Sequence, residues 1–467
     1  MNGLEWFETI LRITYLVVMI LIIVFIVWIL VKPSNNDNDE VVVVNNDFNE
    51  LPSGKVKPVN RTFSDPPDID LELSTDPSPD STLSYTEFKK IVVRQQFVEA
   101  FEKALRKSFY DKREIYIKRQ HQVAKDIRAK MNKSSLTSFM EHDIALTRLK
   151  SLNGEYLSIV KAIDQRLNDL NYESVRAGLM SAVFDPYMGI ESVVGRSDTK
   201  DFLSLQLYSF SQNPRTFYTN FQNIVILGPT GVGKTKLAQT IGYVFATSGI
   251  LVRNKFRSIT KNELTTAYIN ESASLTRDAL MSTLEGILFL DEAYDIVPDK
   301  VLGQKVHDHG SEAVSEMVNF LDKNVGLSIV VAAGYEKDMR ARFLGANDGM
   351  PRRFPHIIKL TGYDAEQLTN LLLTFLAQKS PDLIFCDKEA NFLYALIKFL
   401  LESKPKIFSK HAGDMLNLSG SISRAIYGSK DYVWDNSSSS TNMKLLVKGF
   451  NDYLRQMDLS VKIPDNF

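Results

Sequence analysis

The sequence predicts an α/β fold, in which a doubly wound parallel sheet carries a helical lid and is preceded by a helical segment and one N-terminal transmembrane helix. Three observations support this prediction. The apolar runs FQNIVIL (221–227) and ILFL (287–290) both lead into polar residues, and a helix-like stretch follows the first loop. Residues 85 to about 175 are almost free of Gly and Pro, and residues 13–31 carry no charge.

The chain of 467 residues is too long for one compact domain and suits several segments. The predicted divisions are a short tail (1–12), a transmembrane helix (13–31), a disordered acidic linker (32–84), a basic helical region (85–180), an α/β core (181–360) and a helical lid with a C-terminal helix (361–467). The net charge of −1 gives no global electrostatic argument for a nucleic-acid partner.

The run ITYLVVMILIIVFIVWILV at residues 13–31 is long enough to cross the ~30 Å hydrocarbon core of a bilayer as a helix. A cleaved signal peptide is the alternative. It is disfavoured because the run is too long, because Glu5 and Glu8 precede it, and because no small-residue cleavage site follows. Arg12 and Lys32 lie on opposite sides, so charge does not decide the orientation.

Residues 32–84 combine Asn/Asp runs, several prolines and an excess of acids, a composition that cannot bury enough apolar surface to fold alone. The short run VVVV at 41–44 is an exception that could be a strand or a docking peptide. The same segment holds Asn60-Arg61-Thr62, an N-x-T glycosylation acceptor.

The segment after this linker has apolar residues at helical spacing, namely Val98, Phe101, Leu105 and Phe109. Its first half, 88–133, is basic. An anionic membrane surface or a nucleic-acid backbone would suit this charge, but long helices with a solvated basic face are the simpler interpretation. The single cysteine, Cys386, excludes an internal disulfide and fits a reducing compartment; we expect it to be a small buried residue in a helical region.

The strongest chemical motif is GPTGVGKT, which lies between a predicted strand and a predicted helix. In this context the pattern predicts a phosphate-binding loop (the P-loop), whose backbone N–H groups surround a β-phosphate. Lys234 would bridge β- and γ-phosphate oxygens, and the Thr235 hydroxyl would hold Mg²⁺. The motif consists of Gly228, Pro229, Thr230, Gly231, Val232, Gly233, Lys234 and Thr235.

ILFLDEAY begins a little more than 50 residues after Lys234, where a second parallel strand of a doubly wound sheet is expected. Alone, Asp291 and Glu292 could be a solvated strand end. Together with the P-loop they predict an ATP-hydrolysing site, in which Asp291 contacts the Mg²⁺ shell and Glu292 polarises the attacking water.

These motifs and their order resemble those of AAA+ ATPases, in particular the CbbX/SpoVK-like branch. The resemblance covers residues 185 to 428 and rests on GPTGVGKT and ILFLDEAYDI (the Walker A and Walker B motifs), LTTAYINESA, GSEAVSEMVNFLD, IVVAAGYEKDM and GMPRRF. It implies a hydrolase that binds ATP and Mg²⁺ and assembles with itself into a ring, a hexamer in such families.

The resemblance also implies roles for single residues. Val193, Val194 and Gly195 match the segment that packs near adenine. Tyr268 and Ile269 match the pair with which such rings grip a threaded protein client, although Asn270 replaces the usual Gly; an ordinary helix-capping aromatic is the alternative for Tyr268.

Arg353 matches the arginine finger that stabilises charge on the γ-phosphate of a neighbouring subunit. Arg352 is a second candidate, and a surface salt bridge is the alternative for either arginine. The sensor position holds Tyr335 rather than Asn, as in this branch.

The lid departs from the pattern of that branch. In HAGDMLNL (411–418), Gly413 and Leu416 stand where the branch has arginines, which places the usual lid contact to nucleotide in question. Arg424 is a candidate substitute for them.

The sequence has no H-E-x-x-H motif, which excludes a membrane-anchored AAA+ metalloprotease. His307 and His309 lack neighbouring ligands and indicate a solvated loop rather than a metal site.

The leading hypothesis is a membrane-anchored ring ATPase that remodels or extracts protein partners, with its ATPase domain facing the cytosol. The alternatives are an ATP-dependent nucleic-acid motor or loader and a non-hydrolysing membrane tether. The Asn-rich composition would also suit a viral membrane protein of a large DNA virus.

Overall fold

The computed structural model describes residues 83–132, 139–264, 272–297, 309–430, 433–436, 440–458, 461 and 463. The predicted tail, transmembrane run, Asn60 acceptor and nearly all of the linker lie outside these residues. So do Tyr268, Ile269, Asn270 and His307. Within the described ranges no helix is both long enough and apolar enough to cross a bilayer.

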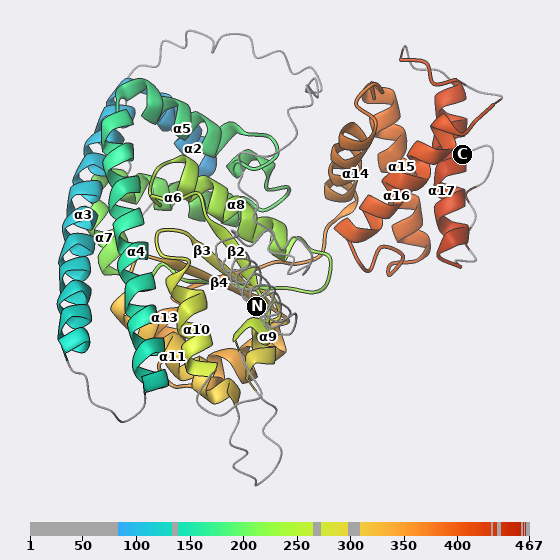
Figure 1. Cartoon of the computed structure of the whole chain (residues 1–467). Coiled ribbons are helices and arrows are strands. Elements are labelled where there is room, and N and C mark those ends of the chain that lie inside the picture. The colour runs from blue at the N-terminus through green and yellow to red at the C-terminus, as the bar shows by residue number, and fades with distance from the viewer. Residues whose placement is uncertain are drawn as a thin grey trace, which may run out of the picture. The chain divides into compact units, whose positions relative to one another are not determined.

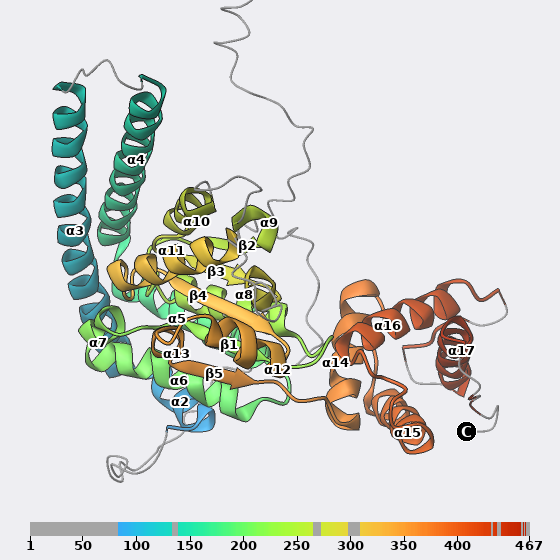
Figure 2. The same cartoon turned by 90° about the horizontal axis from the view of Figure 1, so that it is seen from below.

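The basic region is helical apart from short connections between its helices. Its helices are α2 (Tyr85–Val92), α3 (Gln95–Asn132), α4 (Phe139–Asp169) and α5 (Tyr172–Phe184). Ser84 begins α2 with a capping box to Glu87, and Asn171 caps α5. The four apolar residues whose spacing predicted a helix, Val98, Phe101, Leu105 and Phe109, are all buried. Helices α3 and α4 lie side by side in both views (Figures 1 and 2).

A five-stranded parallel sheet forms the centre of the next region. Its strands are β1 (Ile224–Leu227), β2 (Phe256–Ile259), β3 (Ile287–Leu290), β4 (Ile329–Gly334) and β5 (His356–Lys359). They are arranged in the order β2-β3-β4-β1-β5, which can be followed in Figure 2. Every residue of β1, β3 and β4 is buried, as expected for a parallel sheet covered on both faces.

The strand ILFL is the third strand along the chain, and it is a further parallel strand of the same sheet, as predicted. The strand that was missed, β2, has the sequence FRSI and lies at the sheet edge, where only Phe256 and Ile259 are buried. A short edge strand of this kind lacks the continuous apolar run that revealed β1 and β3. In addition, β4 lies between β1 and β3.

Helical segments lead into the first strand and connect the following ones. They are η1 (Ile190–Ser192), α6 (Ser197–Gln212), α7 (Pro214–Thr219), α8 (Lys234–Thr247), α9 (Lys261–Leu264), α10 (Ser272–Met281), η2 (Ala293–Ile296), α11 (His309–Lys323), α12 (Glu336–Asp338), η3 (Met339–Phe343), η4 (Leu344–Ala346) and α13 (Met350–Arg353). The apolar side chains of the sheet and of helices α2 to α5 belong to one continuous core.

Buried polar contacts also join α3 to the sheet region. The Nζ atom of Lys112 donates to Glu285 Oε2 at 2.7 Å and to the carbonyl oxygen of Ile250 at 3.0 Å. The Tyr116 hydroxyl donates to Glu285 Oε1 at 3.1 Å, and Arg119 donates to the carbonyl oxygen of Lys323 at 2.6 Å. Since α3 shares both a core and buried hydrogen bonds with the sheet region, it is an integral part of this fold.

The C-terminal region, which the sequence predicts to be a lid and which keeps that name below, has a second core of its own. Its helices are α14 (Ala365–Lys379), α15 (Asp387–Ser403), α16 (Ala412–Tyr427) and α17 (Ser440–Gln456). Cys386 was expected to be buried within a helical region. It is instead the partly exposed N-cap of α15, and its Sγ donates to Glu389 at 2.5 Å.

Candidate active site

The P-loop turns sharply between β1 and α8. Gly231 and Gly233 have φ values of +75° and +91°, a left-handed conformation that favours glycine. Gly228 allows a close approach, because a Cβ there would lie 2.8 Å from the carbonyl oxygen of Leu360. The sequence therefore places its glycines where the backbone requires them, and α8 begins directly at Lys234.

The Lys234 side chain is only 8% exposed and lies across this loop. Its Nζ donates to the carbonyl oxygens of Gly228 and Pro229 at 3.1 and 3.2 Å. The same atom lies 4.0 Å from Glu292 Oε1 and 5.0 Å from the centre of the Tyr335 ring. One ammonium group thus connects the end of β1 with residues that follow β3 and β4.

Asp291 and Glu292 follow β3 at its carboxyl end. Asp291 is exposed, and its Oδ1 accepts from the Glu292 backbone N–H at 3.1 Å. Glu292 has φ +47°, an uncommon conformation for a residue with a side chain and one that is concentrated at functional sites. Its Oε2 is buried and has no hydrogen-bond partner among the described residues. A buried carboxylate oxygen without a partner is costly, so this atom is poised to accept a hydrogen bond.

Two tyrosines complete this edge of the sheet. The hydroxyl groups of Tyr335 and Thr230 are hydrogen-bonded at 2.7 Å, and the Tyr335 and Tyr294 rings lie 6.1 Å apart. Burial, followed by the adjacent Glu292 carboxylate, raises the pKa of the Tyr294 hydroxyl above its usual value. The structure thus brings Tyr335 to the P-loop, and it adds Tyr294, which the sequence motif DEAY contained but did not assign.

The candidate metal ligands are a hydroxyl and a carboxylate. Thr235, in the first turn of α8, and Asp291, after β3, both have exposed side chains. Within the described residues there is no cluster of three or more His, Cys, Asp or Glu side chains able to hold a metal ion. Two oxygen donors fit Mg²⁺, which commonly takes one or two protein ligands together with water and substrate phosphates.

The segment that the sequence placed near adenine lies against the start of the C-terminal region. Gly195 has φ +63°, and a Cβ there would lie 2.4 Å from the side chain of Gln367 in the lid. Val194 lies beside Gly195 and is half-buried. The next residue, Arg196, is buried; it donates to the Thr361 hydroxyl and carbonyl at 3.0 and 2.5 Å and lies 4.6 Å from the centre of the Tyr363 ring.

Sequence reasoning missed Arg196 and Tyr363, and only the position of Arg196 directly after Gly195 could have indicated it. Tyr363 donates its hydroxyl proton to the carbonyl oxygen of Val232 at 2.8 Å. The Ala412 N–H at the start of α16 donates to the carbonyl oxygen of Gly231 at 3.0 Å. The lid therefore contacts the P-loop through its backbone and through Tyr363.

The lid residues that replace arginines do not supply a cation to this site. Gly413 has no side chain, and Leu416 is exposed. Arg424, the suggested substitute, donates to Ser421 Oγ at 3.0 Å and to Gln456 Oε1 at 3.3 Å. These partners belong to the lid itself, because Arg424 lies on α16 opposite α17. The suggestion that Arg424 replaces the missing arginines stays a prediction.

The two arginines of α13 differ in exposure. Arg353 is 6% exposed; it forms two hydrogen bonds to the Asp322 carboxylate, one of them at 3.0 Å, and donates to the carbonyl oxygen of Gly349 at 2.8 Å. Arg352 is exposed. Within one chain, Arg353 thus forms the salt bridge that the sequence left open as the alternative.

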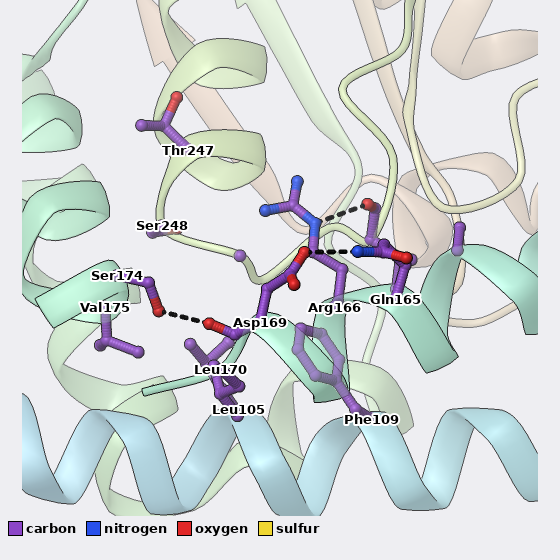
Figure 3. Close-up of a pocket in the computed structure, with 13 residues that line it drawn as sticks. Leu105, Phe109, Gln165, Arg166, Asp169, Leu170, Ser174, Val175, Thr247 and Ser248 are labelled. Carbon is purple, nitrogen blue, oxygen red and sulfur yellow. Dashed lines mark hydrogen bonds between the residues drawn. The ribbon is translucent and has the colours of Figure 1, made fainter. Parts of the chain in front are cut away.

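A pocket of about 350 Å³ lies at the far end of α8, away from the P-loop (Figure 3). Leu105, Phe109 and Val175 give it apolar walls. The Nε atom of Arg166 donates to the carbonyl oxygen of Val252 at 3.3 Å, and burial lowers the pKa of this arginine. Since α8 is about 20 Å long at helical rise, this pocket is distinct from the candidate active site.

Comparison with known proteins agrees with this geometry. Residues 224–360, which span β1 to the residue after β5, match the ATPase family associated with various cellular activities (AAA). Stage V sporulation protein K of Bacillus subtilis is 33% identical over 149 residues, which are 32% of this chain and 44% of that protein. The CbxX plasmid protein of Cupriavidus necator is 30% identical over 151 residues, or 32% and 46% of the two chains.

The chain is also similar over a longer stretch to the ESX-3 secretion system protein EccA3 of Mycobacterium tuberculosis. The two are 28% identical over 221 residues, which are 47% of this chain and 34% of that protein. The chain thus spans about a third to under a half of the length of these curated relatives. Residues 224–360 thus match the AAA family of ATPases, and over this part the chain is similar to sporulation protein K and to CbxX.

Proposed function

We propose that this protein is a membrane-anchored AAA+ ATPase that assembles into a ring, a hexamer, and uses ATP hydrolysis to remodel or extract protein partners. The observation that carries the catalytic part is the convergence of Lys234, Glu292 and Tyr335. These residues follow three different strands of one sheet. The Lys234 ammonium lies 4.0 Å from Glu292 Oε1 and 5.0 Å from the centre of the Tyr335 ring. Such a meeting of strand ends is where ligands bind in open α/β sheets.

In this proposal the P-loop holds the phosphates. Residues 228–233 turn their backbone N–H groups toward the β-phosphate, and the N-terminus of α8 adds the positive end of its dipole. Lys234 exchanges its carbonyl partners for β- and γ-phosphate oxygens, which are stronger acceptors because they are charged. Val194 and Gly195 border the adenine.

Hydrolysis depends on the two carboxylates. Glu292 accepts a hydrogen bond from the attacking water through its unpartnered Oε2 and so orients that water toward the γ-phosphate. Asp291 and Thr235 hold Mg²⁺, which neutralises charge on the phosphates when it is bound. Tyr335 and Thr230 present hydroxyl groups beside the same phosphates.

A ring would complete the site with an arginine from the neighbouring subunit. Arg353 occupies the family position of this residue, and its use in trans requires its pair with Asp322 to open. Arg352 is the exposed alternative on the same helix. Either would stabilise charge on the γ-phosphate.

The client and the membrane are the remaining parts of the proposal. Tyr268 and Ile269 grip an extended protein client inside the ring; a threaded peptide needs aromatic contact there, whereas a nucleic-acid channel usually needs Lys or Arg. The uncharged run at residues 13–31 anchors the chain, and the ATPase domain faces the cytosol, where ATP is present.

A trap variant tests this function. Glu292→Gln should bind ATP, turn over at least ~100-fold more slowly, and retain a protein client during purification. Glu402→Gln, an exposed residue of α15, is the matched control and should behave as the parent. Equal turnover in Glu292→Gln and the parent would refute the catalytic assignment. A nucleic-acid motor would be favoured if Glu292→Gln retained ATP but no protein client, and if DNA stimulated the turnover of the parent.

A further inference from the structure

Helix α3 uses its basic residues in two ways. Those that face the rest of the fold are paired: Lys112 with Glu285, Arg113 with Asp164 at 2.6 Å, and Arg119 with Asn324 at 2.6 Å. These contacts fix α3 against α4 and the sheet region. The other basic residues of α3 take no part in these three contacts.

The opposite face of α3 carries a second set, which we call the basic stripe. It consists of the exposed residues Lys103, Lys107, Lys118, Lys125 and Arg128. Their spacing of three, four, seven or eleven residues places them on one side of the helix, over a length of about 38 Å. Tyr110, Glu114 and His121 lie on the same side and are exposed.

Few acidic side chains neutralise the positive charge of the basic stripe. Lys118 pairs with Glu114 at 2.6 Å, but both side chains are largely exposed, so this pair is weak. Lys103, Lys107, Lys125 and Arg128 form no salt bridge within the described part of the chain. Five bases and one acid therefore face solvent together, and Glu99 lies just beyond the N-terminal end. Such a surface attracts a polyanion.

The geometry favours a flat polyanion. Up to Val123, the other side of α3 packs on α4, α5, α6 and α7 and contributes to the core, so over this length α3 can be approached from one side only. A helix that reads a nucleic-acid groove must instead enter it. The Tyr110 side chain, 57% exposed in the middle of the stripe, has the apolar ring and polar tip of residues that lie at membrane interfaces. The same chain contains the uncharged run at 13–31.

We propose that the basic stripe of α3 binds an anionic lipid surface and holds the ATPase core against the membrane. This inference rests on the proposed membrane attachment, which brings the stripe near a bilayer. Because α3 is joined to Glu285, two residues before β3, lipid contact on its outer face would fix the orientation of the whole core.

A lipid-quenching experiment tests the contact with the full-length chain. In a Cys386→Ser background, Tyr110→Cys is labelled with a fluorophore and mixed with vesicles that contain a quenching lipid. The vesicles are either phosphatidylcholine alone or phosphatidylcholine with phosphatidylserine. We expect quenching that is several-fold stronger with phosphatidylserine and that disappears at 1 M salt, where the Debye length falls to about 3 Å. Tyr427→Cys in the lid, with 55% exposure in the parent residue, is the matched position and should show no difference.

Charge reversal supplies the second arm. Changing Lys103, Lys107, Lys125 and Arg128 to Glu should abolish the phosphatidylserine-dependent quenching at Tyr110→Cys, while thermal unfolding stays unchanged because these side chains are exposed and unpaired. The control reverses four exposed lid lysines, Lys388, Lys398, Lys404 and Lys406, which changes the net charge equally. Retention of quenching in the stripe variant, or its loss in both variants, would overturn the proposal.

Two further outcomes separate this inference from the membrane anchor. Release of the parent chain from vesicles by alkaline carbonate would refute the anchor, whereas the stripe is judged by the dependence of quenching on phosphatidylserine. Equal quenching in both kinds of vesicle would refute the stripe even for a chain that resists carbonate. Protection of the label by duplex DNA, without any phosphatidylserine effect, would identify a nucleic-acid surface instead.

Discussion

Lys112 of α3 and Glu285, two residues before β3, form an ion pair that is closed to solvent. The Nζ–Oε2 distance is 2.7 Å, and the two side chains are 1% and 0% exposed. Glu285 has φ +59°, and its carboxylate also accepts hydrogen bonds from Tyr116 and from the Val252 N–H. Lys112 of α3 thus neutralises the Glu285 carboxylate that is buried in the sheet region. Without the other part, each part would leave one of these two charges unpaired.

Breaking this pair on one side should destabilise the fold strongly. Lys112→Met keeps an unbranched side chain one atom shorter but leaves Glu285 buried without its cation, at a cost of about 3–5 kcal/mol in the free energy of unfolding. The double variant Lys112→Met/Glu285→Gln removes both charges and should recover much of this loss. Urea unfolding of the parent, the two single variants and the double variant measures these free energies. Additive effects of the two substitutions would show that the pair is not coupled.

Binding and turnover should separate between two residues of the candidate site. Lys234→Ala should weaken ATP binding by about tenfold or more, because the phosphates lose a cation. Glu292→Gln should leave that affinity nearly intact, since the carboxylate acts on water. Titration with a fluorescent ATP analogue distinguishes the two. Unchanged affinity in Lys234→Ala would remove the lysine from the site.

The position of Arg353 allows its structural and catalytic roles to be distinguished. Arg353→Ala should abolish turnover while each subunit still binds nucleotide. When it is mixed with Lys234→Ala chains that keep Arg353, activity should partly return. Asp322→Asn breaks the same internal pair but leaves the arginine, so it should remain active.

Equal inactivation of Arg353→Ala and Asp322→Asn, without rescue in mixed assemblies, would assign Arg353 to structure alone. Arg352→Ala then becomes the decisive variant, because Arg352 is exposed on the same helix. Its loss of turnover with retained nucleotide binding would identify it as the residue supplied in trans.

The chain should stay unglycosylated at Asn60 in eukaryotic cells. The Asn60-Arg61-Thr62 acceptor lies about 29 residues after the apolar run, far enough from a bilayer to be modified in the lumen. A cytosolic ATPase domain predicts no glycosidase-sensitive mass there. The control carries an N-x-T site in an added N-terminal extension, at a matched distance on the other side of the apolar run, where we expect modification. A glycan on Asn60 would place the ATPase domain on the wrong side.

Stability should fall on the acid side through His356. Burial lowers the pKa of this residue in β5, where its ring lies 5.1 Å from that of Phe202. The folded state therefore binds fewer protons than the unfolded state below the ordinary pKa of ~6.5, so stability is complete above that pH and is lost as pH falls toward the folded pKa. His356→Gln should lose less stability than the parent between pH 7.5 and 5.5. Parallel losses would show that His356 is not involved.

The sequence by itself determined the elements whose information is local. The glycines at 231 and 233 are required by left-handed backbone, and Val98, Phe101, Leu105 and Phe109 mark the buried side of a helix through their spacing alone. The P-loop and the two carboxylates after β3 could be found because each motif lies within a few consecutive residues. Residues 13–31 can be interpreted only from sequence, since they lie outside the described structure.

Tertiary structure decided what depends on residues far apart in the chain. The edge strand β2 has too few buried positions to show a pattern, and the placement of β4 between β1 and β3 comes from pairing between strands. The burial of Arg353 by Asp322 and the position of Arg196 against Tyr363 depend on side chains that are 31 and 167 residues apart. Lys112 appears in sequence as one more base of a basic helix. Only the fold, by burying Glu285 beside it, separates it from the exposed lysines of the stripe.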